Sequence, residues 1–343
     1  MLKEGELRLA VSIAGNQVVD AHRFVHVPEA WERSYRSTQS TLGLLRSPRI
    51  TFVVLLIVTG AVIGIITWSR GAYPARVAFL AFALMASLMI TALANNWPAF
   101  EARFSTAQPL QLQRTIIAVA GLVAQGLFAA AIALVLGLVH ARIGGSSPNA
   151  PRAPVSVGIA LGALAVGALA LEAMIGRSVS PAWLNYTPAQ TMFPFWSEAT
   201  SPAVAFMIRC AALGMALALT HQLGRGWTRQ RTLIAVALFV FGTLAGQTGS
   251  AATPAMWFAQ GAISGVVLVA LYALALRFDL TLLPVLLATM AGLTAIRAGL
   301  YEAHGAALVG SIAGVLLVAA IANRWLAALR RPTLTPPHAW PPT

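Results

Sequence analysis

The chain has 343 residues, of which 58% are hydrophobic and only 10% are charged. This balance excludes an ordinary soluble domain and predicts an all-α, polytopic membrane bundle of about eight or nine transmembrane helices. The formal net charge of +13 comes from cations scattered over the tails and nearly every loop, with no basic stripe interleaved with aromatic residues. We therefore expect the lipid bilayer as the partner, and no nucleic acid.

The first 49 residues form a polar segment whose five acids and seven cations are unlike a signal peptide. Within this segment, residues 7–19 have the pattern of two short alternating strands about the turn Gly15-Asn16, which predicts a small hairpin. Pro28 can then occupy the first turn of a helix, followed by two glutamates near its positive end. Two roles stay open for the segment: a cap on the membrane surface, or a docking site for a partner.

Nine apolar runs follow, each long enough, at about 17 to 25 residues, to cross a hydrocarbon layer of about 30 Å. Their many small residues suit helices that pack by close backbone approach, and the alternation of a membrane β-barrel is absent. Residues 50–325 form the transmembrane domain, and residues 326–343 form a proline-rich tail. Tryptophans that favour the headgroup layer lie at predicted helix ends: Trp68, Trp97, Trp227 and Trp325. The runs are 50–69, 76–95, 115–139, 155–176, 202–221, 232–247, 254–276, 280–297 and 305–323.

The positive-inside rule places three segments in the cytoplasm: the amino-terminal segment, the loop 222–231 and the C-terminal tail. Nine simple crossings cannot satisfy all three. One run is then re-entrant, or the short run 232–247 does not fully cross the membrane. A second candidate for irregular structure is the stretch 178–201, whose aromatic residues and prolines suggest an interfacial loop.

One strong cation lies well inside an apolar run, and one acid lies within another run. Arg209 stands well inside the run 202–221, and its guanidinium cannot lose its proton, so it must face protein, water or a site. Glu172 lies near the end of the run 155–176. We hypothesise that Glu172 pairs with Arg209 in the membrane. Equally open is a position for Glu172 at the membrane interface near Arg177.

Two segments outside the spanning runs carry a family pattern. Residues 25–33 read Val-His-Val-Pro-Glu-Ala-Trp-Glu-Arg, and residues 95–109 contain Asn-Asn-Trp-Pro and then Ser105-Thr-Ala-Gln-Pro. Both segments resemble parts of the CAAX protease and bacteriocin-processing (CPBP) family of intramembrane metalloproteases. The first resembles the Val-Pro-Glu stretch before that family's first membrane helix. The second resembles its Trp-Pro loop, which is followed by an acid-Thr-x-x-Pro run. Ser105 stands in place of the acid. The resemblance to the large multi-pass members covers most of the chain, and residues 200–297 resemble the family's core.

Three further segments are similar in position to the catalytic motifs of this family. Residues 202–209 are similar to the first motif, EExxxR, with Arg209 as its arginine. Residues 241–245 are similar to the second motif, FxxxH. Residues 277–289 are similar to the stretch that leads to the third motif, in which a His follows a Pro by a few residues. The family is understood to hold a metal and to activate water with these glutamates and histidines. The corresponding positions in this sequence are Val204, Ala205, Ala245 and Thr289, with Ala288 as the other register for the last.

These four side chains cannot form a metal site of the family's kind, because a hydrolytic metal needs about three N, O or S ligands and an open position for water. No other set of metal-ligating residues in the sequence replaces these four positions. His22 and His26 would share a face if helical, but they have no third ligand. Glu302 and His304 fit a polar loop, and His221 fits the C-terminal end of a helix. The single cysteine, Cys210, lies within an apolar run. We predict no metal and no cofactor, with zinc expected only if the chain is a protease.

The resemblance implies a pseudoprotease: a helical membrane protein with degenerate catalytic motifs that works in binding, scaffolding or regulation. Its former active-site cavity could hold a lipid or the membrane segment of another protein. One alternative is an active CAAX-type metalloendopeptidase with a divergent ligand set. Another is a small transporter or channel, although no internal repeat is evident. We expect the protein in the bacterial inner membrane.

Overall fold

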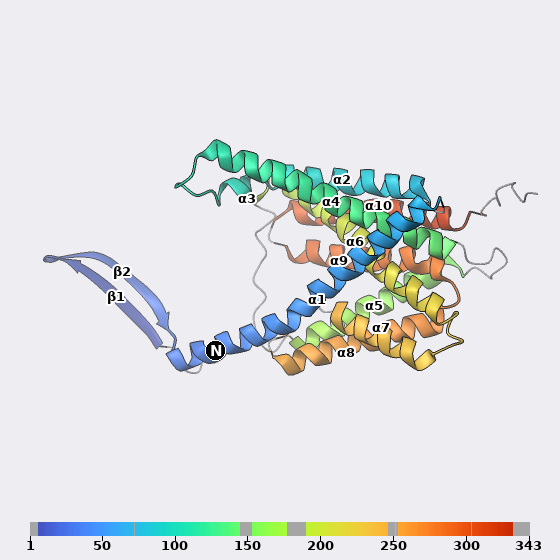
Figure 1. The fold of residues 1–343 in the computed structure, drawn as a ribbon. Coiled ribbons are helices and arrows are strands. Elements are labelled where there is room, and N and C mark those ends of the chain that lie inside the picture. The colour runs from blue at the N-terminus through green and yellow to red at the C-terminus, as the bar shows by residue number, and fades with distance from the viewer. Residues whose placement is uncertain are drawn as a thin grey trace, which may run out of the picture.

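The computed structural model describes residues 6–71, 73–144, 153–176, 190–245, 251, 253–302 and 304–331, which form a helical bundle with an N-terminal β-hairpin (Figure 1). Within these residues, eight helices are long and apolar enough to cross a membrane. The expected all-α polytopic bundle is therefore confirmed, and the chain is a multi-pass integral membrane protein. Its elements are β1 (Glu6–Ala14), β2 (Gln17–His26), α1 (Glu29–Ser69), α2 (Ala75–Asn95), α3 (Trp97–Glu101), α4 (Leu110–Gly144), α5 (Val155–Gly176), α6 (Pro194–Leu223), α7 (Arg231–Ala245), α8 (Pro254–Leu271), α9 (Leu283–Tyr301) and α10 (Ala306–Leu329).

The predicted hairpin is present. Strands β1 and β2 pair antiparallel with Leu7 opposite Val25, and they are joined at Gly15, whose φ of 64° suits a tight turn that only glycine adopts without strain. The second strand continues to His26, further than predicted. The two histidines at positions 22 and 26 therefore lie on a strand, and the helical face assumed for them is wrong.

Helix α1 joins the hairpin directly to the bundle. It begins at Glu29, just after Pro28 as predicted, and it runs through Pro48 to Ser69 without a break. The polar segment and the first spanning run therefore share one helix across the expected boundary at residue 49. Outside the apolar part, Leu42 is fully buried in a small cluster with Trp257 near the start of α8. This contact anchors the N-terminal half of α1.

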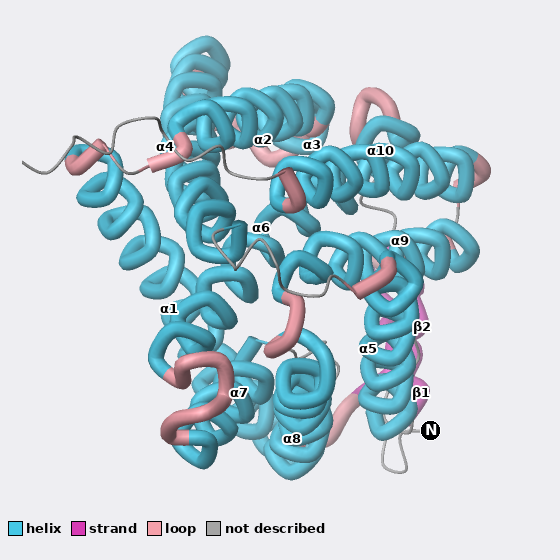
Figure 2. Tube along the Cα trace, turned by 90° about the vertical axis from the view of Figure 1, so that its right-hand side faces the viewer, coloured by secondary structure: helices cyan, strands magenta, loops and turns pink. Residues whose placement is uncertain are grey.

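The spanning helices run in alternating directions, and their ends meet at two faces. His221 of α6 lies 3.2 Å from the hydroxyl of Tyr272, where α8 ends, and Trp325 of α10 donates a hydrogen bond of 3.3 Å to His140 of α4. We call the face where these helices end the arginine face (Figure 2 views the bundle from it). The opposite face, from which β1 and β2 project, is the hairpin face. The arginine face is defined by Arg70, Arg76, Arg142, Arg225, Arg229, Arg231, Arg277, Arg330 and Arg331.

This arrangement separates the three segments that the positive-inside rule placed together. The loop after α6 and the end of α10 lie at the arginine face, whereas the hairpin lies at the other face. Helix α7 has 15 residues, or about 22 Å of helix, which is less than the thickness of the hydrocarbon layer. The described helical part of this run, Arg231–Ala245, is therefore shorter than a full crossing. Its neighbour α8 begins at the opposite face.

Helices α7 and α8 pack through glycine. A Cβ atom on Gly242 would lie 2.7 Å from the Cα atom of Gly265, and a Cβ atom on Gly265 would lie 2.7 Å from the carbonyl oxygen of Phe239. Neither distance allows a side chain, so the two backbones touch directly, as in membrane helix pairs built on small residues. Helices α7 and α8 consequently form one tightly packed unit.

A buried carboxylate joins three helix ends at the arginine face. Asp279 Oδ1 accepts hydrogen bonds from the backbone N–H (2.9 Å) and the hydroxyl (2.6 Å) of Thr281, at the start of the α9 segment. Asp279 Oδ2 accepts from the backbone N–H of Ala153 (3.1 Å), just before α5. Arg330, after α10, lies 3.7 Å from Asp279 Oδ2 and donates to the carbonyl of Ala153 at 2.9 Å. We call this set the Asp279 latch.

Tyr73 fixes the connection between α1 and α2. Its hydroxyl donates a hydrogen bond of 2.8 Å to the carbonyl of Leu134 in α4. The space for the ring exists because residue 137 is glycine, on which a Cβ atom would lie 2.3 Å from the Tyr73 oxygen. Burial raises the pKa of Tyr73 to about 12, so the hydroxyl keeps its proton and remains a donor at neutral pH.

We expect the arginine face to lie in the cytoplasm, because it concentrates the arginines that flank the spanning helices. Single cysteines introduced as Thr228→Cys in the arginine face and Ser12→Cys in the hairpin test this orientation. An impermeant maleimide should label Ser12→Cys in intact cells and Thr228→Cys only after the membrane is opened. The native Cys210 is fully buried and should stay unlabelled. The reverse labelling pattern would show that the orientation is inverted.

Removing the Asp279 carboxylate should destabilise the bundle. Asp279→Ala leaves the backbone N–H groups of Ala153 and Thr281 without this acceptor, at a cost of about 2 kcal/mol or more in the free energy of unfolding. The measurement is thermal unfolding of the purified protein in detergent. The matched control is Asp20→Ala on the exposed hairpin, which should leave the melting temperature unchanged. Equal melting temperatures for the two variants would show that the latch is not a stabilising element.

Candidate functional site

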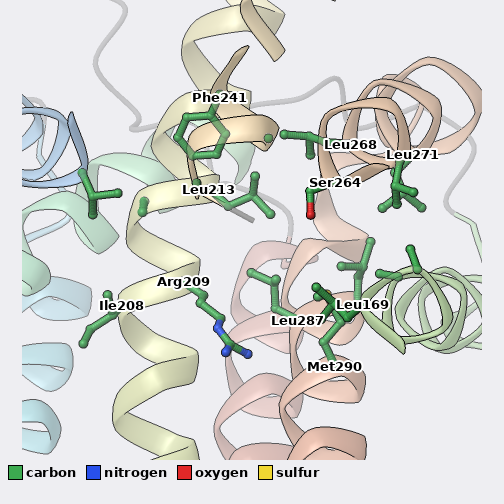
Figure 3. Close-up of a pocket in the computed structure, with 18 of the residues that line it drawn as sticks. Leu169, Ile208, Arg209, Leu213, Phe241, Ser264, Leu268, Leu271, Leu287 and Met290 are labelled. Atoms are coloured by element: carbon green, nitrogen blue, oxygen red, sulfur yellow. The ribbon is translucent and has the colours of Figure 1, made fainter. Parts of the chain in front are cut away.

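The candidate site is a cavity of about 480 Å³ inside the helical bundle. Seven helices line it, namely α1, α4, α5, α6, α7, α8 and α9, and most of the lining is aliphatic. Figure 3 shows the aliphatic walls formed by residues such as Leu169, Leu271 and Leu287. Binding sites for small molecules commonly have this size and combine an apolar lining with a few polar groups. Here the ionisable or hydroxyl-bearing side chains of the lining are Glu172, Arg209 and Ser264.

Glu172 is held at the α5 wall by two residues of α8. The Ser264 hydroxyl donates a hydrogen bond to Glu172 Oε1, and the Gln260 side-chain amide donates to the backbone carbonyl of Glu172 at 3.0 Å. The residue is fully buried, and within the described chain its second carboxylate oxygen, Oε2, has no hydrogen-bond partner. A buried oxygen without a partner is costly. Glu172, a residue of the cavity wall, thus keeps one buried carboxylate oxygen without a hydrogen-bond partner in the described chain.

Arg209 enters the cavity from the opposite side. It lies near the middle of α6, and Figure 3 shows its guanidinium extending toward the wall that carries Leu287 and Met290, while the Ser264 hydroxyl points in from α8. The structure places both residues of the hypothesised pair in the lining of one cavity. Arg177, named in the alternative for Glu172, lies outside the described residues.

The positions that resemble the protease motifs converge only in part. Arg209 and Ala245 line the cavity, whereas Val204, Ala205 and Thr289 do not. The hydroxyl of Thr289 instead donates to the carbonyl of Val285 within α9, and its side chain packs where Gly162 of α5 leaves room. Ala288, the other register, is also absent from the lining, although Met290, two residues further along α9, is present.

Metal-ligating side chains are dispersed in the part of the chain that the structure describes. No group of three or more His, Cys, Asp or Glu residues there could hold a metal ion. Inside the bundle, Glu198 Oε1 lies 3.8 Å from His304 Nε2 at the hairpin face. The other described histidines are His22 and His26 in the hairpin and His140 and His221 toward the arginine face, and His338 lies outside the described residues.

The Trp-Pro segment has a structural role in this chain. Asn95, which is buried, accepts a hydrogen bond from the backbone N–H of Phe193 (2.8 Å) and donates to Ser197 (2.8 Å), so it holds the start of α6. Ser105, in place of the family's acid, accepts from the backbone N–H of Ala107 at 3.2 Å. An acid at that position could make the same bond. Neither residue reaches the cavity.

Sequence reasoning found two of the polar lining residues and missed the third. Ser264 carries no charge, so it was not distinguished from the small residues of its run. One signal was available: Gln260 and Ser264 are polar, lie four residues apart in an apolar run, and so share one helical face. A polar face on a spanning helix points to a partner inside the bundle. The structure identifies that partner as Glu172.

No family profile, curated protein or solved structure matches this chain.

Loss of the Ser264 hydroxyl should destabilise the protein, since it leaves Glu172 without the donor to Oε1. Ser264→Ala is expected to lower the free energy of unfolding by about 1 to 3 kcal/mol, measured as a lower melting temperature in detergent. The matched control is Ser87→Ala, because the Ser87 hydroxyl bonds only to the carbonyl of Leu84 in its own helix. If both variants melt at the same temperature, the Ser264–Glu172 bond contributes nothing measurable.

Proposed function

We propose that this chain is a non-catalytic membrane protein that binds an apolar ligand in the cavity between its helices. The observation that carries the proposal is the cavity itself: about 480 Å³ of space with mostly aliphatic walls and a small polar group set. A cavity lined this way favours a lipid or another hydrocarbon chain, because the apolar surface of such a ligand would contact mostly apolar side chains.

A binding role accounts for the residues better than hydrolysis does. Two of the family-like positions, Arg209 and Ala245, face the cavity, and the alanine offers no metal ligand. The described chain contains no cluster of three ligating side chains, and hydrolysis by a bound metal requires about that many. On this proposal, the cavity descends from a CPBP-like active site and has kept the space while losing the ligands.

The position of the cavity also suits a ligand drawn from the bilayer. Arg209 lies 14 residues before the end of α6. Ser264 lies 12 residues before Leu276, the last residue of a π-helical segment (Tyr272–Leu276) that continues α8. At 1.5 Å per residue, both are about 20 Å from the arginine face. This depth falls within the hydrocarbon layer, so the polar groups face a ligand that is already inside the membrane.

Filling the cavity tests the proposal. A photoactivatable long-chain alcohol, added to the full chain in detergent, should label cavity peptides in a saturable manner. Ala168 of α5 lines the cavity, so Ala168→Phe should reduce labelling about tenfold because the ring occupies the binding space. The matched control is Ala170→Phe on the exposed side of the same helix, which should label like the wild type.

Two results would overturn the proposal. The first is labelling that does not saturate, or that Ala168→Phe leaves unchanged. The second is stoichiometric zinc in the purified protein, removed by a chelator together with a peptide-cleaving activity. That outcome would establish the metalloprotease instead.

A further inference from the structure

We infer that the loop between α6 and α7 binds the headgroup phosphate of an anionic phospholipid. The loop covers residues 224–230 at the arginine face, and Arg231 follows it as the first residue of α7. None of these residues lines the cavity, so the inference is independent of the proposed function. It follows from three features: the unbalanced charge of the face, the backbone of the loop, and the aromatic contact that sets the depth of the loop.

The first feature is the difference in counter-charge between the two faces of the bundle. At the arginine face the described residues contain one acid, Asp279, and its ion pair is with Arg330. The remaining arginines of this face have no acid of the described chain to balance them, so their counter-charge comes from outside the protein. On the hairpin side, by contrast, four arginines form ion pairs with glutamates at N···O distances of 3.7 Å or less: Arg8, Arg33, Arg36 and Arg114.

The loop concentrates this unbalanced charge. Arg225, Arg229 and Arg231 are all exposed, and none of them takes part in the ion pairs of the described residues. Arg231 Nε donates a hydrogen bond of 2.8 Å to the carbonyl of Trp227, which ties its guanidinium to the loop. Guanidinium groups match the oxygens of a phosphate in a two-pronged geometry. Three of them on one short loop therefore favour a phosphate ligand.

The second feature is the conformation of the loop backbone. Arg225, Trp227 and Gln230 have φ angles of 44°, 75° and 53°, in the left-handed region that residues other than glycine rarely adopt. The backbone N–H groups of Thr228 and of the residue after it both donate to the carbonyl of Gly224 at 3.0 Å. The loop is thus held in a strained shape, and such strain is concentrated in binding segments.

The third feature is the contact that fixes the depth of the loop in the membrane. The ring centroid of Trp227 lies 5.6 Å from that of Tyr272, with 60° between the two planes. Tyr272 is fully buried, and its hydroxyl lies 3.2 Å from His221 Nδ1 at the end of α6. Tryptophan at a helix end favours the headgroup layer. The arginines of the loop therefore lie at the level of the lipid phosphates, and a phospholipid is the ligand rather than a dissolved phosphate.

Competition between lipids of different charge tests the inference. Full-length protein in micelles of an uncharged detergent is titrated with a fluorescent phosphatidylglycerol. Unlabelled phosphatidylglycerol and phosphatidylcholine with the same acyl chains then compete for the site. We expect phosphatidylglycerol to compete about tenfold better, because the cation of choline opposes the arginines. Equal competition by the two lipids overturns the inference. Displacement of the probe by inorganic phosphate or a single-stranded oligonucleotide, at the same concentration as phosphatidylglycerol, also overturns it, since the ligand is then soluble.

A combined variant assigns the contacts to the loop. Arg225→Gln, Arg229→Gln and Arg231→Gln in one protein should weaken binding of phosphatidylglycerol about tenfold or more, because each arginine near an anionic lipid surface contributes roughly a factor of five. Binding of phosphatidylcholine should not change. The corresponding three changes to lysine keep the charge and should recover most of the affinity, which separates the loss of charge from damage to the loop. Wild-type affinity in the glutamine variant, or no recovery with lysine in a protein that melts like the wild type, overturns the assignment.

The matched control removes three charges from the hairpin side instead. Arg8→Gln, Arg33→Gln and Arg36→Gln change the net charge by the same amount, at exposed arginines that already pair with glutamates. This variant should bind phosphatidylglycerol like the wild type. If its affinity falls as far as that of the loop variant, the effect belongs to the net charge of the protein and the inference of a site in the loop is wrong.

Discussion

The carboxylate of Asp279 and its partner Arg330 bond at the ends of three helices, and two of these helices, α5 and α9, line the cavity. Asp279 is one of the few buried charges in the described chain, and it bonds to the start of the α9 segment and to the backbone before α5. Arg330 adds the end of α10. In a membrane, helix packing receives little help from the hydrophobic effect, because lipid tails are as apolar as the helices. Polar contacts at the helix ends therefore help to fix the positions of α5 and α9 relative to each other.

The wall that these helices form carries the chemistry of the site. Glu172 lies toward the far end of α5 from the latch, and Leu287 and Met290 lie on α9. The opposite wall belongs to α6, with Arg209, and the α7–α8 unit closes the space with Ser264 and Ala245. One acid and one permanent cation thus belong to the lining of one aliphatic volume. Glu172 lies four residues before the end of α5, and Arg209 lies near the middle of α6.

Much of this structure could be predicted from the sequence, because long apolar runs leave the backbone few alternatives to helices in a membrane. Each of the nine expected runs coincides with a helix over its described residues, and Gly15 and Pro28 marked the hairpin turn and the helix start. The start of α6 was harder: Pro194 begins the helix and Pro202 lies inside it, so the proline at 202 was a false boundary. The bond between Glu172 and Ser264 joins residues that are 92 positions apart in the sequence, and the bond between Ala153 and Asp279 joins residues that are 126 positions apart. No local pattern reveals such contacts.

The continuity of α1 has a mechanical consequence. Ile50, Val53 and Ile57 of this helix line the cavity, and the same helix carries the hairpin at its other end. An α-helix is a stiff rod, and the interior proline at position 48 is the place where this one can bend. One continuous backbone therefore connects the hairpin to the wall of the cavity, and its possible bend at Pro48 lies between the contact of Leu42 with Trp257 and the first lining residue, Ile50.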